Sequence, residues 1–134
     1  MKLEVLIIDD DKLIILIHEK MIKISSFHAQ PLSFLNGKLG LDYIRGNNDA
    51  NKVYFIFLDI NMPVMNGWEF LEAINQSPLA GQVLVAVLSS STNETDKQKS
   101  IKYTQVIKYI EKPLNLQKLQ ELKAETKLKP YFNK

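Results

Sequence analysis

Short apolar runs alternate with longer amphipathic segments along the chain. The candidate strands are residues 3–8, 28–35, 53–58, 83–88 and 105–110. The first, third and fourth of these are rich in Val, Ile, Leu or Phe without alternating, which is typical of strands covered on both faces in a parallel sheet. Residues 105–110 form a weaker run. The second contains Pro31, which cannot donate a ladder hydrogen bond, so we expect that strand at a sheet edge.

The segments between these runs are predicted to be helical, although residues 94–103 are polar and form a weak candidate. The candidate helices are residues 12–24, 37–44, 66–75, 94–103 and 115–127. This alternation of strand and helix predicts an α/β fold with a doubly wound, five-stranded parallel sheet. Ligands bind beyond the carboxyl ends of the strands in such sheets, so the residues after each strand are the first to examine for a functional site.

Length and composition narrow the class of protein. The 134 residues correspond to one domain, which we expect over residues 1–134. The absence of cysteine excludes disulfides, thiol catalysis and Cys-ligated metal sites. The net charge of +2 is too balanced to indicate nucleic-acid binding through charge. No apolar run reaches the length of a membrane span or resembles a signal peptide, so we expect a cytoplasmic protein.

Polar residues follow four of the predicted strands. The first strand is followed by Asp9, Asp10 and Asp11, the third by Asp59 and then Asn61, the fourth by Ser89, and the fifth by Lys112. The carboxyl ends of parallel strands meet at one edge of the sheet, so these groups should share a pocket. Clustered carboxylates favour a hard divalent cation such as Mg²⁺, and a carboxylate can also accept a phosphoryl group. The lysine and the hydroxyl would then hold phosphoryl oxygens.

Several polar and aromatic residues also have a simpler interpretation that involves no functional site. The three aspartates could cap the helix that follows, and we expect Asp11 to do little else. Residues 89–91 could form a solvated loop, and Tyr109 could be an ordinary strand aromatic. His18 and His28 are expected to be structural or surface residues.

Residues 13–17 are five consecutive apolar residues, which one helix face cannot bury together. They therefore predict either a helix wedged between neighbours or an exposed docking patch.

Four segments, taken in order, resemble the response-regulator receiver family. They are VLIIDDDK, FIFLDINMPVMNGWEFL, VAVLSSST and YIEKPLN, and they cover almost the whole chain. Their spacing also matches, with 49 residues from Asp10 to Asp59, 30 from Asp59 to Ser89 and 23 from Ser89 to Lys112. The resemblance implies the CheY-like, flavodoxin-like strand order 2-1-3-4-5. It also implies a single receiver domain with no output domain.

The resemblance assigns a role to each matching position. Asp59 corresponds to the phosphoryl acceptor, and Lys112 to the active-site lysine, whose bond to Pro113 is typically cis in relatives. Mg²⁺ would be held by Asp10, Asp59 and the backbone carbonyl of Asn61, with Asp9 completing the acidic pair indirectly. Ser89 corresponds to the switch hydroxyl and Tyr109 to the aromatic switch residue. Ser91 borders the site in relatives.

The implied function is that of a two-component response regulator. A sensor histidine kinase or a histidine phosphotransfer protein would phosphorylate Asp59, and the receiver would catalyse only its own phosphorylation and dephosphorylation. It would switch a surface for an unknown protein target, as a monomer or a phosphorylation-dependent dimer, without contacting nucleic acid or membrane. The alternatives are a phosphorelay intermediate, a phosphate sink, a small phosphatase with an aspartate nucleophile, or a flavin-binding module. Asn61 argues against the phosphatase, because such enzymes usually have a second aspartate there. The three aspartates after the first strand argue against flavin.

Overall fold

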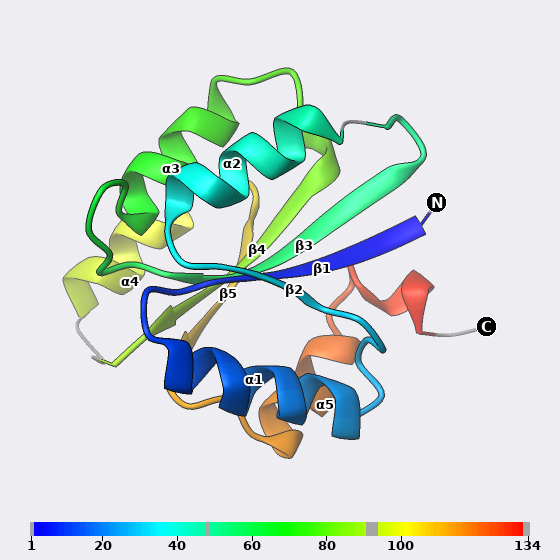
Figure 1. The fold of residues 1–134 in the computed structure, drawn as a ribbon. Coiled ribbons are helices and arrows are strands. Elements are labelled where there is room, and N and C mark those ends of the chain that lie inside the picture. Colours follow the sequence, from blue (N-terminus) through cyan, green and yellow to red (C-terminus); the bar gives the residue numbers. More distant parts are fainter. Residues whose placement is uncertain (1, 48, 91–93, 133–134) are drawn as a thin grey trace.

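A parallel sheet of five strands forms the centre of the computed structural model, which describes residues 2–47, 49–90 and 94–132 (Figure 1). The strands are β1 (Lys2–Ile8), β2 (Leu32–Phe34), β3 (Lys52–Asp59), β4 (Val83–Ser89) and β5 (Val106–Glu111). Their order in the sheet is β2-β1-β3-β4-β5, which confirms the predicted topology. All four pairings are parallel, so the carboxyl ends of the strands lie along one edge.

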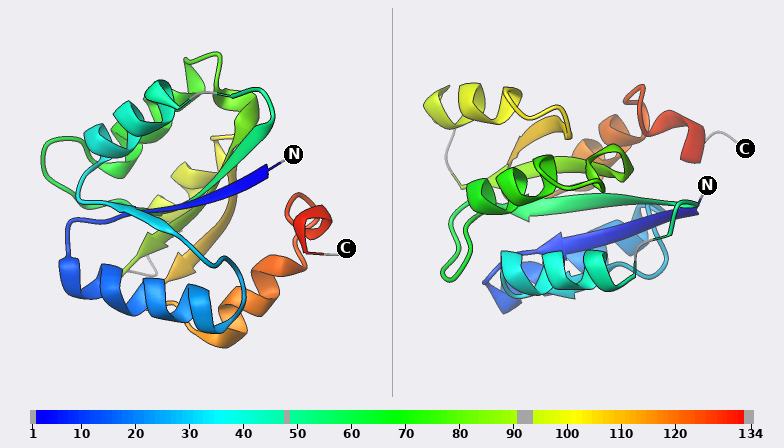
Figure 2. Two further views of the ribbon diagram at one scale, coloured as in Figure 1. Left: turned by 45° about the vertical axis from the view of Figure 1, so that its right-hand side comes forward. Right: turned by 90° about the horizontal axis from the view of Figure 1, so that it is seen from above.

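Helices cover both faces of this sheet. They are α1 (Lys12–Ile24), α2 (Gly37–Gly46), α3 (Gly67–Asn75), α4 (Glu94–Ile101) and α5 (Leu116–Lys123), with short 3₁₀ helices η1 (Ala80–Gln82) and η2 (Lys129–Tyr131). Helices α1 and α5 lie side by side on one face, and α2, α3 and α4 lie on the other (Figures 1 and 2). None of the helices within the described residues is long and apolar enough to cross a membrane.

The core consists of two apolar layers, one on each face of the sheet. Successive strand residues point to opposite faces, so Leu6 and Ile8 pack towards α2 and α3 while Val5 and Ile7 pack towards α1 and α5. All four side chains are fully buried. The continuous apolar runs therefore reflect strands that are buried on both sides.

The second strand and the last helix are shorter than predicted. The second strand was expected over residues 28–35, but the backbone N–H groups of Phe27 and His28 both donate to the Ile22 carbonyl at the end of α1. This segment therefore belongs to the turn after α1, and only three residues pair with β1. The last helix was expected to reach residue 127. It ends at Lys123 because the chain then tightens into turns that bury Leu128 completely.

Helix α1 leaves part of its apolar surface uncovered. Ile15 is buried in the core, whereas 65% of Leu13, 63% of Leu16 and 38% of Ile17 remain exposed. The helix begins where expected, because the side chain of Asp11 accepts hydrogen bonds from the first-turn N–H groups and caps it. Of the two interpretations for residues 13–17, the structure bears out an exposed apolar patch.

Helix α4 has little contact with the core. Within its eight residues only Ser100 is buried, and the helix ends at Ile101 rather than at Tyr103 as predicted. Tyr103 lies in the turn that follows, with its ring stacked on Trp68 of α3 at 6.4 Å between centroids. The Lys99 ammonium lies 4.7 Å from the centre of the same indole ring. The Lys99 side chain thus links α4 to α3, and the Tyr103 ring links the following turn to the same helix.

Candidate functional site

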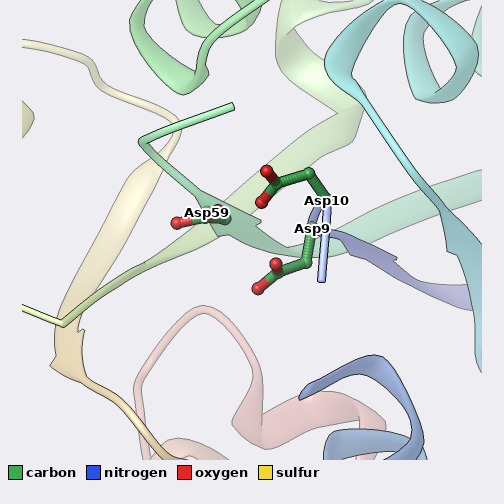
Figure 3. Close-up of side chains that lie close together, drawn as sticks. All are labelled: Asp9, Asp10 and Asp59. Atoms are coloured by element: carbon green, nitrogen blue, oxygen red, sulfur yellow. The ribbon is translucent and has the colours of Figure 1, made fainter. Parts of the chain in front are cut away.

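Three aspartates come together at the carboxyl edge of the sheet. Asp9 and Asp10 follow β1, and Asp59 is the last residue of β3. Because Ile8 pairs with Leu58 in these neighbouring strands, Asp9 and Asp59 end up side by side. One carboxylate oxygen from each aspartate lies within 4.8 Å of the others. Figure 3 shows the three side chains close together. Asp9 and Asp59 are buried and Asp10 is exposed, so the cluster opens to solvent on one side.

The ammonium group of Lys112 contacts two of these carboxylates. Its Nζ lies 2.8 Å from Oδ2 of Asp9 and 3.2 Å from Oδ1 of Asp59. Lys112 follows β5, and its backbone N–H donates to the Ser89 carbonyl at 2.8 Å, which holds it against the end of β4. Burial opposes the positive charge, but the hydrogen bonds and charges of Asp9 and Asp59 outweigh it and raise the pKa of Lys112.

Burial and nearby charges shift the pKa of the Asp59 carboxyl. Burial, followed by the charge of Asp9, raises its pKa to about 6, while Lys112 and the backbone N–H of Asn61 act in the opposite direction. The Asn61 N–H lies 3.4 Å from Oδ1 of Asp59. Asp59 is therefore ionised at neutral pH but held in an environment that disfavours its charge. A cation beside the carboxylate would relieve this cost.

The loop after Asp59 is fixed by close backbone packing. The N–H of Gly67, at the start of α3, donates to the Ile60 carbonyl at 2.9 Å. A Cβ atom on Gly67 would lie 2.7 Å from the Asp59 carbonyl oxygen, so only glycine fits without displacement. Asn66 and Glu69 form a capping box that sets the first turn of α3. The residues between Asp59 and α3 are thus held back against the end of β3.

The remaining predicted site residues lie at varying distances from this cluster. Ser89 is the buried last residue of β4, and Asn61 is exposed beside Asp59. Tyr109 is half-buried in β5, where it pairs with Val87 and packs on the core layer under α2 and α3. It lies outside the group of carboxylates. Ser91 lies outside the described residues. The peptide bond from Lys112 to Pro113 is cis, as expected.

One residue beside the site, His18, was not assigned to the site from the sequence. His18, on α1, is completely buried, and its Nε2 accepts a hydrogen bond from the backbone N–H of Leu114 at 3.3 Å. The available signal was its position. Ile15, His18 and Ile22 are the buried residues of α1, so a polar ring occupies a place on the core face. The expectation of a structural or surface histidine did not include a contact with the loop that carries Lys112.

Comparison with known proteins agrees with this geometry. Residues 5–123 match the response regulator receiver domain. The chain is 30% identical over 132 residues to the Two-component response regulator ARR17 of Arabidopsis thaliana, covering 92% of this chain and 84% of that protein. It is 30% identical over 94 residues to the Probable methanogenesis regulatory protein FilR2 of Methanothrix harundinacea. That match covers 69% of this chain but only 60% of the length of FilR2.

A solved structure shares the whole architecture. The two component response regulator from Cytophaga hutchinsonii superposes with a TM-score of 0.82 at 29% sequence identity, covering 91% of this chain and 95% of that one. The match to the receiver domain runs from Val5, within β1, to the end of α5 and contains Asp9, Asp10, Asp59, Ser89 and Lys112. This chain therefore belongs to the response regulator receiver domain family.

Proposed function

We propose that this receiver domain accepts a phosphoryl group on Asp59 from a phosphohistidine donor. The observation that carries the proposal is the position of the Lys112 ammonium between the carboxylates of Asp9 and Asp59, at 2.8 and 3.2 Å. This arrangement places a fixed positive charge beside a buried carboxylate whose pKa is raised to about 6. Phosphoryl transfer depends mostly on such positioning and charge neutralisation.

The transfer requires the ionised form of Asp59. A carboxylate oxygen of Asp59 attacks the phosphorus atom, an O–P bond forms, the P–N bond to the donor imidazole breaks, and the imidazole nitrogen takes up a proton. Lys112 then neutralises phosphoryl oxygens by charge-assisted hydrogen bonding, and the Ser89 hydroxyl donates to another. Hydrolysis of the resulting acyl phosphate would return Asp59 to its carboxylate form.

The donor set at this edge fits Mg²⁺. Three carboxylates with oxygens within 4.8 Å of one another offer the hard oxygen ligands that this ion prefers. Asp10, Asp59 and the backbone carbonyl of Asn61 would hold it, and Asp9 would contribute charge beside Lys112. When bound, Mg²⁺ supplies positive charge that offsets the carboxylates and the phosphoryl oxygens.

The phosphodonor would be a sensor histidine kinase or a histidine phosphotransfer protein. The exposed residues Leu13, Leu16 and Ile17 lie on α1, which begins two residues after Asp10, so an apolar surface adjoins the acidic site. We assign this patch to donor docking, because burying apolar area there would bring the donor histidine to the open side of the cluster. The output would be protein contact, switched through Ser89 and Tyr109.

Acetyl phosphate tests the acceptor directly. With Mg²⁺, one phosphoryl group should be added to the wild-type protein, visible by intact mass, and chelation should prevent it. Asp59→Asn should abolish the addition. Asp11→Asn, which removes a charge beside the site but keeps a capping side chain, should retain it. Phosphorylation that persists in Asp59→Asn would contradict the assignment. Rapid, repeated hydrolysis of p-nitrophenyl phosphate would instead favour the phosphatase alternative.

The switch can be examined separately from the acceptor. Beryllofluoride mimics a phosphoryl group on an aspartate, so it should shift NMR signals from the region 94–123 in the wild type. Ser89→Ala should still accept the mimic at Asp59 but lose most of the distal shifts, because no hydroxyl is left to move towards it. Equal distal shifts in both proteins would refute the coupling of Ser89 to Tyr109.

A further inference from the structure

One of the three buried positions of helix α1 is occupied by a histidine. Ile15 and Ile22 on the same face are aliphatic, whereas His18 between them places two ring nitrogens in an apolar layer. Burying polar atoms is unfavourable unless they form hydrogen bonds. The Nδ1 atom of His18 has no hydrogen-bond partner among the described residues. A leucine or methionine would avoid this cost, so packing alone does not account for the histidine.

What the histidine provides is an acceptor for a backbone N–H. Nε2 of His18 accepts from the N–H of Leu114 at 3.3 Å, in a buried environment. Burial lowers the pKa of His18 to about 4, so the ring is neutral near pH 7 and Nε2 has a free lone pair. No aliphatic side chain at this position could satisfy that N–H.

The Leu114 N–H belongs to the segment that carries Lys112. Immediately before Pro113, the backbone N–H of Lys112 donates to the Ser89 carbonyl at 2.8 Å. Pro113 has no N–H to donate. The next donor along the chain is Leu114, so the His18 bond fixes the far side of the same short segment. The segment is thus attached to β4 on one side and to α1 on the other.

We propose that His18 is a positioning residue, which holds the Lys112 segment against α1 so that the Lys112 ammonium stays between Asp9 and Asp59. The proposal rests on the proposed phosphorylation of Asp59, because that reaction is where the position of Lys112 matters. A small displacement of a positioned group can cost up to about a hundredfold in rate. Residue 18 would therefore affect the chemistry without touching the phosphoryl group.

The test compares substitutions that differ in whether they can accept a hydrogen bond. His18→Leu and His18→Met keep an apolar side chain but remove the acceptor, whereas His18→Gln retains an acceptor oxygen. Ile22→Leu is the matched control on the same face of α1. With acetyl phosphate and Mg²⁺, the Leu and Met variants should phosphorylate roughly tenfold or more slowly. The Gln variant should recover most of the rate, and the control should match the wild type.

Two further readouts separate positioning from folding. The melting temperatures of the His18 variants should not correlate with their phosphorylation rates. The Leu and Met variants should be at least as stable as the Gln variant, although they react more slowly. The NMR signal of the Lys112 ammonium should move in the Leu and Met variants and stay near its wild-type position in the Gln variant. If either apolar variant fails to fold, the other serves for the comparison.

The outcomes also distinguish this inference from the proposed function. If the wild type does not phosphorylate Asp59 but the Lys112 signal responds as described, the proposed function fails and the positioning role stands. If folded His18→Leu or His18→Met phosphorylates at the wild-type rate with an unchanged Lys112 signal, the positioning role is overturned. It is also overturned if the Leu, Met and Gln variants all lose rate in proportion to their loss of melting temperature.

Discussion

Replacing Asp59 by asparagine should stabilise the fold at neutral pH when no divalent cation is present. Asp59 is 6% exposed, and its carboxylate adjoins the buried carboxylate of Asp9. Burial and this neighbouring charge raise its pKa from 3.8 to about 6, even with Lys112 at 3.2 Å. Asparagine has nearly the same shape and carries no charge, so it removes the cost of holding an anion in this place.

The size of the effect follows from the difference between folded and unfolded pKa values. A carboxyl that ionises at pH 6 rather than 3.8 makes the folded protein less stable by about 3 kcal/mol once the group is fully charged. The folded state binds the proton more tightly, so wild-type stability should fall as pH rises from about 4 to about 6 and then level off. Asp59→Asn lacks this contribution.

Urea unfolding of both proteins in EDTA, at several pH values between 4 and 7.5, measures this directly. The advantage of Asp59→Asn should grow by about 2.4 kcal/mol across that range, because part of the effect is already present at pH 4. Asp42→Asn is the control, because it makes the same change at an exposed position beside Lys38, and its effect should stay within about 0.5 kcal/mol. Adding Mg²⁺ should raise the free energy of unfolding of the wild type far more than that of Asp59→Asn. A difference between wild type and Asp59→Asn that is constant with pH would refute the reasoning.

Two further predictions concern the loop and the acidic pair. Gly67→Ala should reduce the unfolding free energy by about 1–3 kcal/mol in urea titrations, because its Cβ would lie 2.7 Å from the Asp59 carbonyl oxygen. Gly46→Ala, where a Cβ meets nothing within 4 Å, should not, and comparable losses in both would contradict this account. Asp10→Asn should weaken Mg²⁺ binding in calorimetric titrations far more than Asp11→Asn, because Asp11 caps α1; equal effects would mean that Asp10 is not the ligand.

The position of the site at the carboxyl edge of the sheet was predictable, because the apolar strands and the polar residues that follow them are visible in short stretches of sequence. Four of the predicted strands are followed by polar residues. The ends of β1 and β3 therefore placed Asp9 beside Asp59 once these strands were taken as parallel neighbours. The resemblance to the receiver family supplied the order of the strands. Lys112 could be assigned to the same edge, although its reach across β4 to both carboxylates depends on tertiary packing.

Other features depend on contacts that no short stretch of sequence contains. The end of α5 is set by the burial of Leu128, and the length of β2 by hydrogen bonds from residues 27 and 28 to the end of α1. The exposure of Leu13 and Leu16 depends on what the rest of the fold leaves uncovered. His18 could be recognised as a core residue by its spacing, but its partner, Leu114, is 96 residues away in the chain.

The shallow attachment of α4 has a consequence for how such a protein can diversify. Only Ser100 of its eight residues is buried, and substitutions at exposed positions usually change stability by no more than about 0.5 kcal/mol. Mutations can therefore accumulate along α4 at little cost to folding, while the packing of Gly67 against Asp59 tolerates almost none. Descendants of one gene could acquire new recognition surfaces on this helix and keep the same acidic site.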